Sequence, residues 1–153
     1  MVEDCLGTLP AVIRSGKVLT GGGSAEVELA SQLKTYAESV DGIERLGIEA
    51  FARALEIIPK TLAENAGYNP LEVLVEMRSL NAKIGPKSGF DAFTGKVRDL
   101  YEENVLEPLL VKKQAISAAG ELALMILRIN DIIAATKLSL PSPEQMAAPG
   151  NMG

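Results

Sequence analysis

The sequence contains no histidine and no tryptophan, and it has a single cysteine, Cys5, among 153 residues. The absence of histidine excludes the usual zinc sites and the Ser-His and Cys-His nucleophile pairs, because each of these needs an imidazole. A single cysteine cannot form a disulfide within the chain, which favours a reducing compartment. Any catalysis by this chain must therefore use carboxylates, lysines or backbone groups.

Basic runs and long apolar runs are also scarce. The net charge is −5 and the longest basic run is Lys112-Lys113, so the sequence does not predict a nucleic-acid interface. No stretch reaches the roughly 18 to 20 apolar residues of a membrane span. Glu3 and Asp4 stand where a signal peptide would need apolar residues. We therefore expect a soluble, cytoplasmic protein without nucleic-acid or membrane partners.

Hydrophobic residues nevertheless make up 47% of the chain, which is enough to build a core. Apolar residues recur at helical spacing over most of the sequence. The expected helices lie within residues 2–18, 21–40, 42–67, 69–85 and 103–130, the last of them beginning after Pro108. No internal repeat is present. The pattern predicts a mainly α-helical, multi-helix protein.

Several residues mark where these helices begin and end. Ser24 is expected to cap the helix that follows the glycines, and Pro59 is expected to kink or divide the long run 42–67. Asn69 and Pro70 form a strong helix start, and that helix should stop near Gly85.

Two helical segments carry a wide apolar stripe, which is typical of a buried helix. In the run 42–67 the stripe consists of Ile43, Leu46, Ile48, Phe51, Leu55, Ile58 and Leu62. In the last segment the residues expected to point inward are Leu110, Ile116, Ala119, Leu122, Met125 and Ile126.

The stretch SGFDAFTGKVRDLY, residues 88–101, has a different pattern. Apolar residues flank the turn dipeptide Thr94-Gly95, which predicts a short β-hairpin in which Asp91 could cap the turn. The β-branched stretch 131–138 is expected to form a short C-terminal strand, and residues 139–153 a flexible tail rich in proline and glycine.

Three features offer candidate chemistry, and each has a simpler explanation. Gly21 to Gly23 precede a helix, where backbone N–H groups and the helix dipole could receive an anion, although the local pattern favours a plain turn. No Walker or dinucleotide-binding spacing follows the glycines. Asp4 and Glu107 could be functional carboxylates, but acidic residues near a helix start are usually solvated charges.

Five segments in order resemble the C-terminal part of a group II (thermosome-type) chaperonin subunit. They are VEDCL, VLTGGGSAEVELASQL, FARALEIIPKTLAENAGYNPLEVLVEMRS, GFDAFTGKVRDLYEENVLEPLLVKKQAI and LALMILRINDIIAA. The third segment is the most family-specific. The resemblance implies the helical bundle of the chaperonin equatorial domain, with a small hairpin at the nucleotide site.

The resemblance also implies roles for individual residues. Asp4 matches the acid that orients or activates the attacking water, and a carboxylate can do so without histidine. The backbone at Gly22 matches the glycine that lies against the nucleotide, and Glu107 matches the acid that reaches the ribose hydroxyls. The residues that match the stretch around the adenine are Asp91, Ala92 and Phe93.

The implied function is that of an ATP-dependent chaperonin that assists protein folding, with ATP and Mg²⁺ as cofactors in the complete subunit. Its implied partners are other subunits of a ring oligomer and unfolded client proteins. Residues 1–16 correspond to the end of the intermediate domain, 17–138 to the C-terminal half of the equatorial domain and 139–153 to the tail.

The family's phosphate-binding loop, its G-D-G-T-T motif and its apical domain have no match in this chain. We therefore expect one segment of a longer subunit, which supplies the adenine and ribose side of the ATP site and ring contacts and is inactive as an ATP hydrolase on its own. The alternative is a stand-alone helical fragment with a structural or self-association role and no ATPase activity. A small-molecule enzyme is disfavoured because histidine and a metal cluster are missing from the sequence.

Overall fold

The computed structural model describes the backbone of residues 2–129 and the side chains from residue 6 onward. The expected strand 131–138 and the tail 139–153 lie outside the described residues. The chain divides into two units, Met1–Ser117 and Ala118–Gly153, and the features that position the candidate site all belong to the first.

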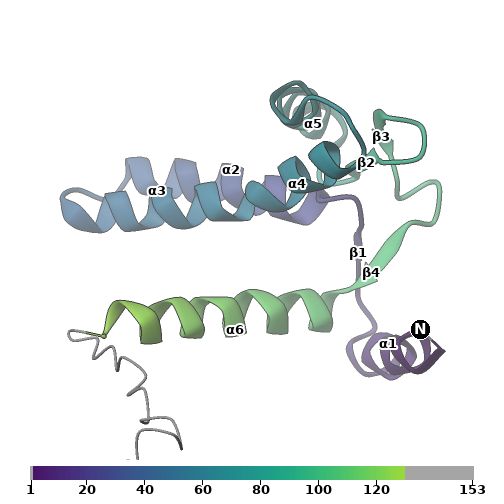
Figure 1. Ribbon diagram of the computed structural model, residues 1–153, viewed down its shortest axis with the longest axis horizontal. Coiled ribbons are helices and arrows are strands. Elements are labelled where there is room, and N and C mark those ends of the chain that lie inside the picture. Colours follow the sequence, from purple (N-terminus) through teal and green to yellow (C-terminus); the bar gives the residue numbers. More distant parts are fainter. Residues whose placement is uncertain (1, 130–153) are drawn as a thin grey trace, which may run out of the picture. The chain divides into compact units, whose positions relative to one another are not determined.

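The described part of the chain contains six helices and four short strands (Figure 1). The helices are α1 (Val2–Ser15), α2 (Ser24–Glu38), α3 (Ile43–Leu55), α4 (Ile57–Asn65), α5 (Pro70–Ile84) and α6 (Leu109–Leu127). The strands are β1 (Val18–Thr20), β2 (Ser88–Asp91), β3 (Lys96–Asp99) and β4 (Leu106–Pro108). The prediction of a mainly helical fold with a small hairpin is confirmed.

Most of the predicted helix boundaries are also confirmed. The run 42–67 divides at Glu56 into α3 and α4, with Pro59 in the first turn of α4, where its missing N–H costs no helical hydrogen bond. Asn69 caps α5 by accepting a hydrogen bond from the Leu71 amide at 3.0 Å. The same helix ends at Gly85, whose φ of 77° favours glycine.

The prediction that Ser24 caps α2 is wrong. The N-cap is Gly23, whose φ of 79° is left-handed, and Ser24 is the first helical residue. The Ser24 side chain is fully buried, and its hydroxyl has no hydrogen-bond partner among the described residues. The glycine turn therefore starts this helix through its backbone conformation.

The four strands form two small antiparallel sheets. Strands β2 and β3 pair as the predicted hairpin, with Phe90 opposite Val97. Strands β1 and β4 pair with Leu19 opposite Glu107, a contact that the sequence analysis did not predict. This second pair places Glu107 close to the strand that leads into the glycine turn.

The main core lies between α2, α4, α5 and the hairpin, and it includes Val27, Ala63, Met77 and Phe90. A second, smaller cluster joins α2 to α3 through the small residues Ala30 and Ala52 together with Leu55, and Ile116 packs against it. Figure 1 shows α2 and α3 side by side. No helix among the described residues is long and apolar enough to cross a membrane.

The predicted burial of the two apolar stripes is wrong for most of their residues. Ile43 is 86% exposed and Leu46 61%, because α3 packs against α2 only through the face that carries Ala52 and Leu55. Helix α6 has no buried residue, and Leu122, Met125 and Ile126 are all more than half exposed. Within the described residues these stripes are mostly apolar surface, although Leu55 is buried and Leu62 and Ile116 pack against the core clusters.

Candidate functional site

The glycine turn packs directly against the β2–β3 hairpin. The Gly22 carbonyl accepts a hydrogen bond from the Phe90 amide at 3.0 Å, and the Gly21 amide donates to the Val105 carbonyl at 2.9 Å. Gly22 has a φ of +66°, and a Cβ placed on it would lie 2.5 Å from Leu100 Cδ1 and 2.9 Å from the Phe90 backbone. Only glycine fits this position without displacing the hairpin.

A pocket of about 370 Å³ opens between the glycine turn and the hairpin. Of the residues with predicted nucleotide contacts, it is lined by Gly22, Asp91, Ala92 and Phe93. The remaining lining residues are Leu62, Phe90, Thr94, Arg98, Leu100, Glu103 and Val105. The volume falls in the range of small-ligand sites, and apolar walls with a few polar groups are typical of them.

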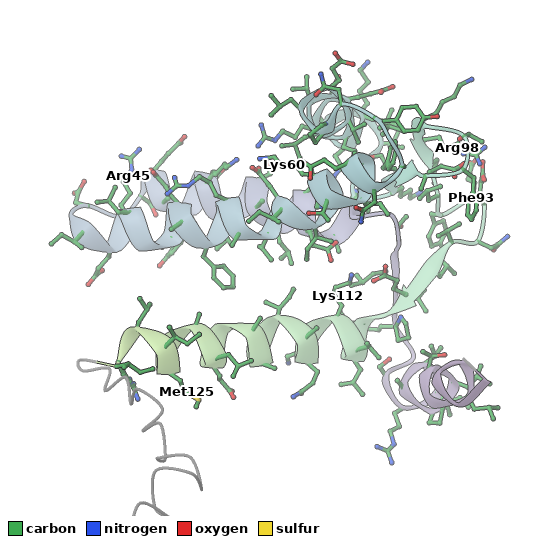
Figure 2. The ribbon with its side chains drawn as sticks, viewed as in Figure 1. Arg45, Lys60, Phe93, Arg98, Lys112 and Met125 are labelled. Atoms are coloured by element: carbon green, nitrogen blue, oxygen red, sulfur yellow. The ribbon has the colours of Figure 1, made fainter. Side chains whose placement is uncertain are left out.

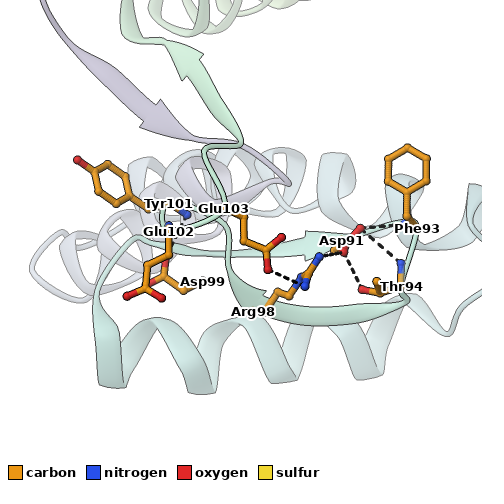
Figure 3. A network of polar contacts seen from close by, with 8 residues as sticks. All are labelled: Asp91, Phe93, Thr94, Arg98, Asp99, Tyr101, Glu102 and Glu103. Atoms are coloured by element: carbon orange, nitrogen blue, oxygen red, sulfur yellow. Dashed lines mark hydrogen bonds and ion pairs between the residues drawn. The ribbon is translucent and has the colours of Figure 1, made fainter.

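Asp91 organises the turn of the hairpin through its carboxylate (Figure 3). Oδ1 accepts hydrogen bonds from the amides of Phe93 at 2.9 Å and Thr94 at 3.4 Å, and Oδ2 accepts from the Thr94 hydroxyl at 2.7 Å. The predicted capping role of Asp91 is therefore confirmed. The hydrogen bond from Thr94 is the main cause that lowers the pKa of Asp91; burial opposes it, and the Phe93 amide and Arg98 add to the lowering.

Arg98 links two carboxylates at the same place. Its Nη2 pairs with Asp91 Oδ2 and its Nη1 lies 2.6 Å from Glu103 Oε1 (Figure 3). Its Nε is buried and has no partner among the described residues. Arg98 was not predicted to be a site residue from the sequence. In the observed register Arg98 lies opposite Gly89 and is therefore a diagonal neighbour of Asp91. The opposite charges of Asp91 and Arg98 at diagonal positions of a predicted hairpin could have indicated their pairing from the sequence.

Phe93 occupies the tip of the hairpin. Its side chain is 100% exposed, while its amide is fixed by Asp91. Figure 3 shows the Phe93 ring pointing away from the ribbon. An aromatic ring held at the rim of an apolar pocket offers a flat face to a second ring system.

Glu107 does not line the pocket but lies beside the glycine turn. Its Oε1 is 3.5 Å from the point that a Cβ on Gly21 would occupy, and its Oε2 is 2.5 Å from Lys112 Nζ. Lys112 in turn lies 2.6 Å from Oε1 of the buried Glu26. Neither Lys112 nor Glu26 was predicted from the sequence: Lys112 lies only five residues after Glu107, but Glu26 reaches this place through the pairing of β1 with β4.

Asp4 belongs to α1, and its side chain lies outside the described residues. The structure therefore brings together Gly22 and the hairpin residues predicted to contact the nucleotide, and it places Glu107 next to the glycine turn. Among the described residues, no group of three or more cysteine or carboxylate side chains is placed to hold a metal ion.

Comparisons with known proteins agree on one family. A model of the TCP-1/cpn60 chaperonin family matches residues 1–137. A thermosome subunit of Methanopyrus kandleri is 51% identical over 138 residues, which are 90% of this chain and 25% of that protein. Thermosome subunit beta of Methanothermobacter thermautotrophicus is 50% identical over 152 residues, which are 99% of this chain and 28% of that protein.

A solved structure shares the fold. It is an open-state monomer of a group II chaperonin from Methanococcoides burtonii, with a TM-score of 0.78 and 49% sequence identity. The match covers 83% of this chain and 32% of that one. The chain thus spans about a quarter of the length of the curated relatives it matches.

Proposed function

The chain belongs to the TCP-1/cpn60 chaperonin family, and from that membership we propose that it forms the adenine and ribose side of an ATP site in a chaperonin subunit. In this proposal the subunit hydrolyses ATP to assist the folding of client proteins and assembles with other subunits into a ring. The mainly helical fold, shared with the group II chaperonin from Methanococcoides burtonii, is that of the equatorial domain. A cytoplasmic location stays a prediction.

The observation that carries the proposal is the pocket between the glycine turn and the hairpin. Its apolar walls, which include Leu62, Phe90 and Leu100, suit a purine ring. Phe93 at the rim can stack on the base, and the bare backbone of Gly22 lets the nucleotide approach closely. The Asp91 network keeps the hairpin turn in one conformation without the ligand, which reduces the ordering cost of binding.

Two carboxylates complete the proposal. Glu107 accepts hydrogen bonds from the ribose hydroxyls, because a carboxylate offers two acceptor oxygens and Oε1 faces the glycine turn. Asp4 orients the attacking water, since phosphoryl transfer needs mainly positioning and charge stabilisation. Mg²⁺ usually binds through one or two carboxylates together with substrate phosphates, so in the complete subunit it would lie on the phosphate side, whose loop and G-D-G-T-T motif have no match in this chain.

The test uses a chimaeric subunit in which this chain replaces the matching segment of the Methanothermobacter thermautotrophicus relative. Asp4→Ala should abolish ATP hydrolysis and leave ADP binding intact, because the residue acts on water. Glu107→Ala should weaken ADP binding about tenfold, the effect of roughly one charge-assisted hydrogen bond. Unchanged turnover removes Asp4 from the mechanism, and an unchanged dissociation constant removes Glu107 from the ribose site.

A second role is favoured by the exposed apolar side chains. Ile43, Leu46 and Phe51 on α3 and Leu71 and Val75 on α5 leave apolar surface uncovered in the described chain. Apolar surface of this kind promotes association. We therefore propose that the 153-residue chain self-associates when isolated, without ATPase activity. Sedimentation equilibrium tests this: a monomer at micromolar concentration contradicts it.

A further inference from the structure

Lys112 contacts carboxylates from two elements that are far apart in the sequence. Its Nζ lies 2.6 Å from Glu26 Oε1 on α2 and 2.5 Å from Glu107 Oε2 on β4. Lys112 itself lies in the first turn of α6, directly after β4, as Figure 2 shows. One ammonium group therefore joins the start of α2 to the strand that carries Glu107.

Glu26 is the fixed end of this arrangement. Its side chain is only 1% exposed, and it lies in the first turn of α2, which begins immediately after the glycine turn. A buried carboxylate is costly unless it is paired, so Glu26 holds Lys112 in place strongly. Burial acts to lower the pKa of Lys112, but the hydrogen bonds to Glu107 and Glu26 outweigh burial and raise that pKa. Lys112 thus stays charged at neutral pH.

Glu107 is the accessible end. Its side chain is 38% exposed, so without a partner it could adopt several rotamers. Lys112 occupies Oε2 and leaves Oε1 on the side of the glycine turn. A carboxylate oxygen has two acceptor sites, so the ion pair leaves Glu107 able to accept hydrogen bonds from a ligand.

Resting on the proposed ribose contact of Glu107, we infer that Lys112 is a positioning residue that holds the Glu107 carboxylate ready for the ribose hydroxyls. Lys112 does not touch the nucleotide in this arrangement. It pairs with Glu26 in the buried first turn of α2 and thereby fixes the position of the Glu107 carboxylate relative to that turn. Glycine turn and ribose acceptor are thereby fixed relative to one another before the nucleotide binds, which lowers the entropy lost on binding.

A purely structural role for Lys112 makes a different prediction. If the lysine only stabilised the packing of α2 against β4, its loss would weaken binding of every adenine nucleotide to the same degree. If it positions Glu107, the loss depends on the ribose hydroxyls. ADP and 2′,3′-dideoxyADP, which lacks both hydroxyls, separate the two roles.

The experiment measures dissociation constants of both nucleotides by calorimetry on the chimaeric subunit described above. Lys112→Met should weaken ADP binding about three- to tenfold and change 2′,3′-dideoxyADP binding less than about twofold, because one hydrogen-bonded group is affected. Lys112→Arg should restore most of the ADP affinity, since it keeps the charge. Lys113→Met, a change at the exposed neighbouring lysine, is the matched control and should alter neither constant.

Lys112→Met also leaves Glu26 as a buried charge without its cation, which can unfold the variant. The double variant Glu26→Gln/Lys112→Met removes that charge and keeps the test of Glu107 intact. It should show the same selective loss of ADP affinity.

Glu107→Ala, measured in the same series, separates two failures. If Glu107→Ala weakens ADP binding selectively and the Lys112 variants do not, or if the Lys112 variants weaken both nucleotides equally, the inference is wrong and the ribose contact stands. If Glu107→Ala is itself without a selective effect, the ribose contact is wrong and the inference fails with it.

Discussion

Arg98 reaches across the β2–β3 hairpin and pairs with Asp91, whose carboxylate also fixes the turn that carries Phe93. One side chain on β3 and one on β2 thus hold the rim of the candidate pocket in place. Ion pairing and hydrogen bonding determine the conformation of this rim. The exposed ring of Phe93 remains available for contact with a ligand.

The pH dependence of stability should reflect the carboxylate of Asp91. Its pKa in the folded chain lies below the ordinary value, with the Thr94 hydrogen bond as the main cause. The stabilisation is therefore fully present above about pH 4 and is lost as the pH falls through the folded pKa. Thr94→Val removes the main cause of the lowered pKa, so the unfolding free energy of this variant should fall less on acidification than that of the unchanged chain. Urea unfolding at pH 5 and at pH values below the ordinary pKa of aspartate measures the difference. Thr35→Val, at an exposed helical threonine, is the control.

Gly22→Ala should destabilise the chain by about 1–3 kcal/mol, because a Cβ there meets Leu100 and the Phe90 backbone at a left-handed φ. Gly47→Ala is the matched control. No atom lies within 4 Å of a Cβ at Gly47, and the residue is inside α3, so alanine should stabilise by about 0.5–1 kcal/mol. Urea unfolding measures both. Equal effects of the two substitutions would show that the glycine turn does not need glycine.

Glu56 joins the α3–α4 junction to two other helices by pairing with Lys34 of α2 at 2.5 Å and with Arg78 of α5. Burial of Glu56 acts to raise its pKa, but these hydrogen bonds outweigh burial and lower it. Glu56→Gln should lower the unfolding free energy by about 1–3 kcal/mol, because Lys34 and Arg78 would then donate to a neutral amide oxygen and not to a carboxylate.

The control for Glu56 is Glu49→Gln. Glu49 pairs with Arg45 at 2.8 Å on the surface of α3, where ion pairs contribute little. The unfolding midpoint of this variant should be unchanged within error. If Glu49→Gln lowered the unfolding free energy as much as Glu56→Gln does, the loss of one negative charge, and not the loss of the contacts at the α3–α4 junction, would explain the destabilisation.

Phe93→Ala should separate binding from folding. The ring is 100% exposed, so its removal should leave the unfolding midpoint unchanged. If Phe93 stacks on adenine, ADP binding to the chimaeric subunit should weaken by about 1 kcal/mol, roughly fivefold. Tyr36→Ala removes another exposed aromatic ring, on α2 and away from the pocket, and should change neither quantity. Unaltered ADP affinity in Phe93→Ala would argue against the base contact.

The sequence predicted features that depend on local chemistry. Asn69 and Pro70 start a helix because a side-chain acceptor and a fixed φ act within one turn, and the hairpin follows from Thr94-Gly95 between apolar residues. The resemblance to the family drew attention to Gly22 and the hairpin residues because they occur in recognisable local patterns, and the structure brings them to one pocket; their contact with a base stays a prediction.

Features that depend on distant contacts were not predicted. Strand β1 has only three residues, and its sequence does not indicate which strand it pairs with. The pairing of Leu19 with Glu107 could therefore not be predicted from the sequence. The same pairing brings Lys112 and Glu26 together. The burial of the α3 stripe could not be read from periodicity, because periodicity shows which face is apolar and not whether a neighbour covers it.

The pairing of β1 with β4 has a consequence for synthesis on the ribosome. Strand β1 is made before α2, α3, α4, α5 and the hairpin, and β4 only after them. The helices and the hairpin rely on contacts closer in sequence and can form while translation continues. Until Lys112 leaves the exit tunnel, Glu26 lacks the cation that pairs with it in the described structure, so the burial of this carboxylate should be completed only after β4 and the start of α6 have been made.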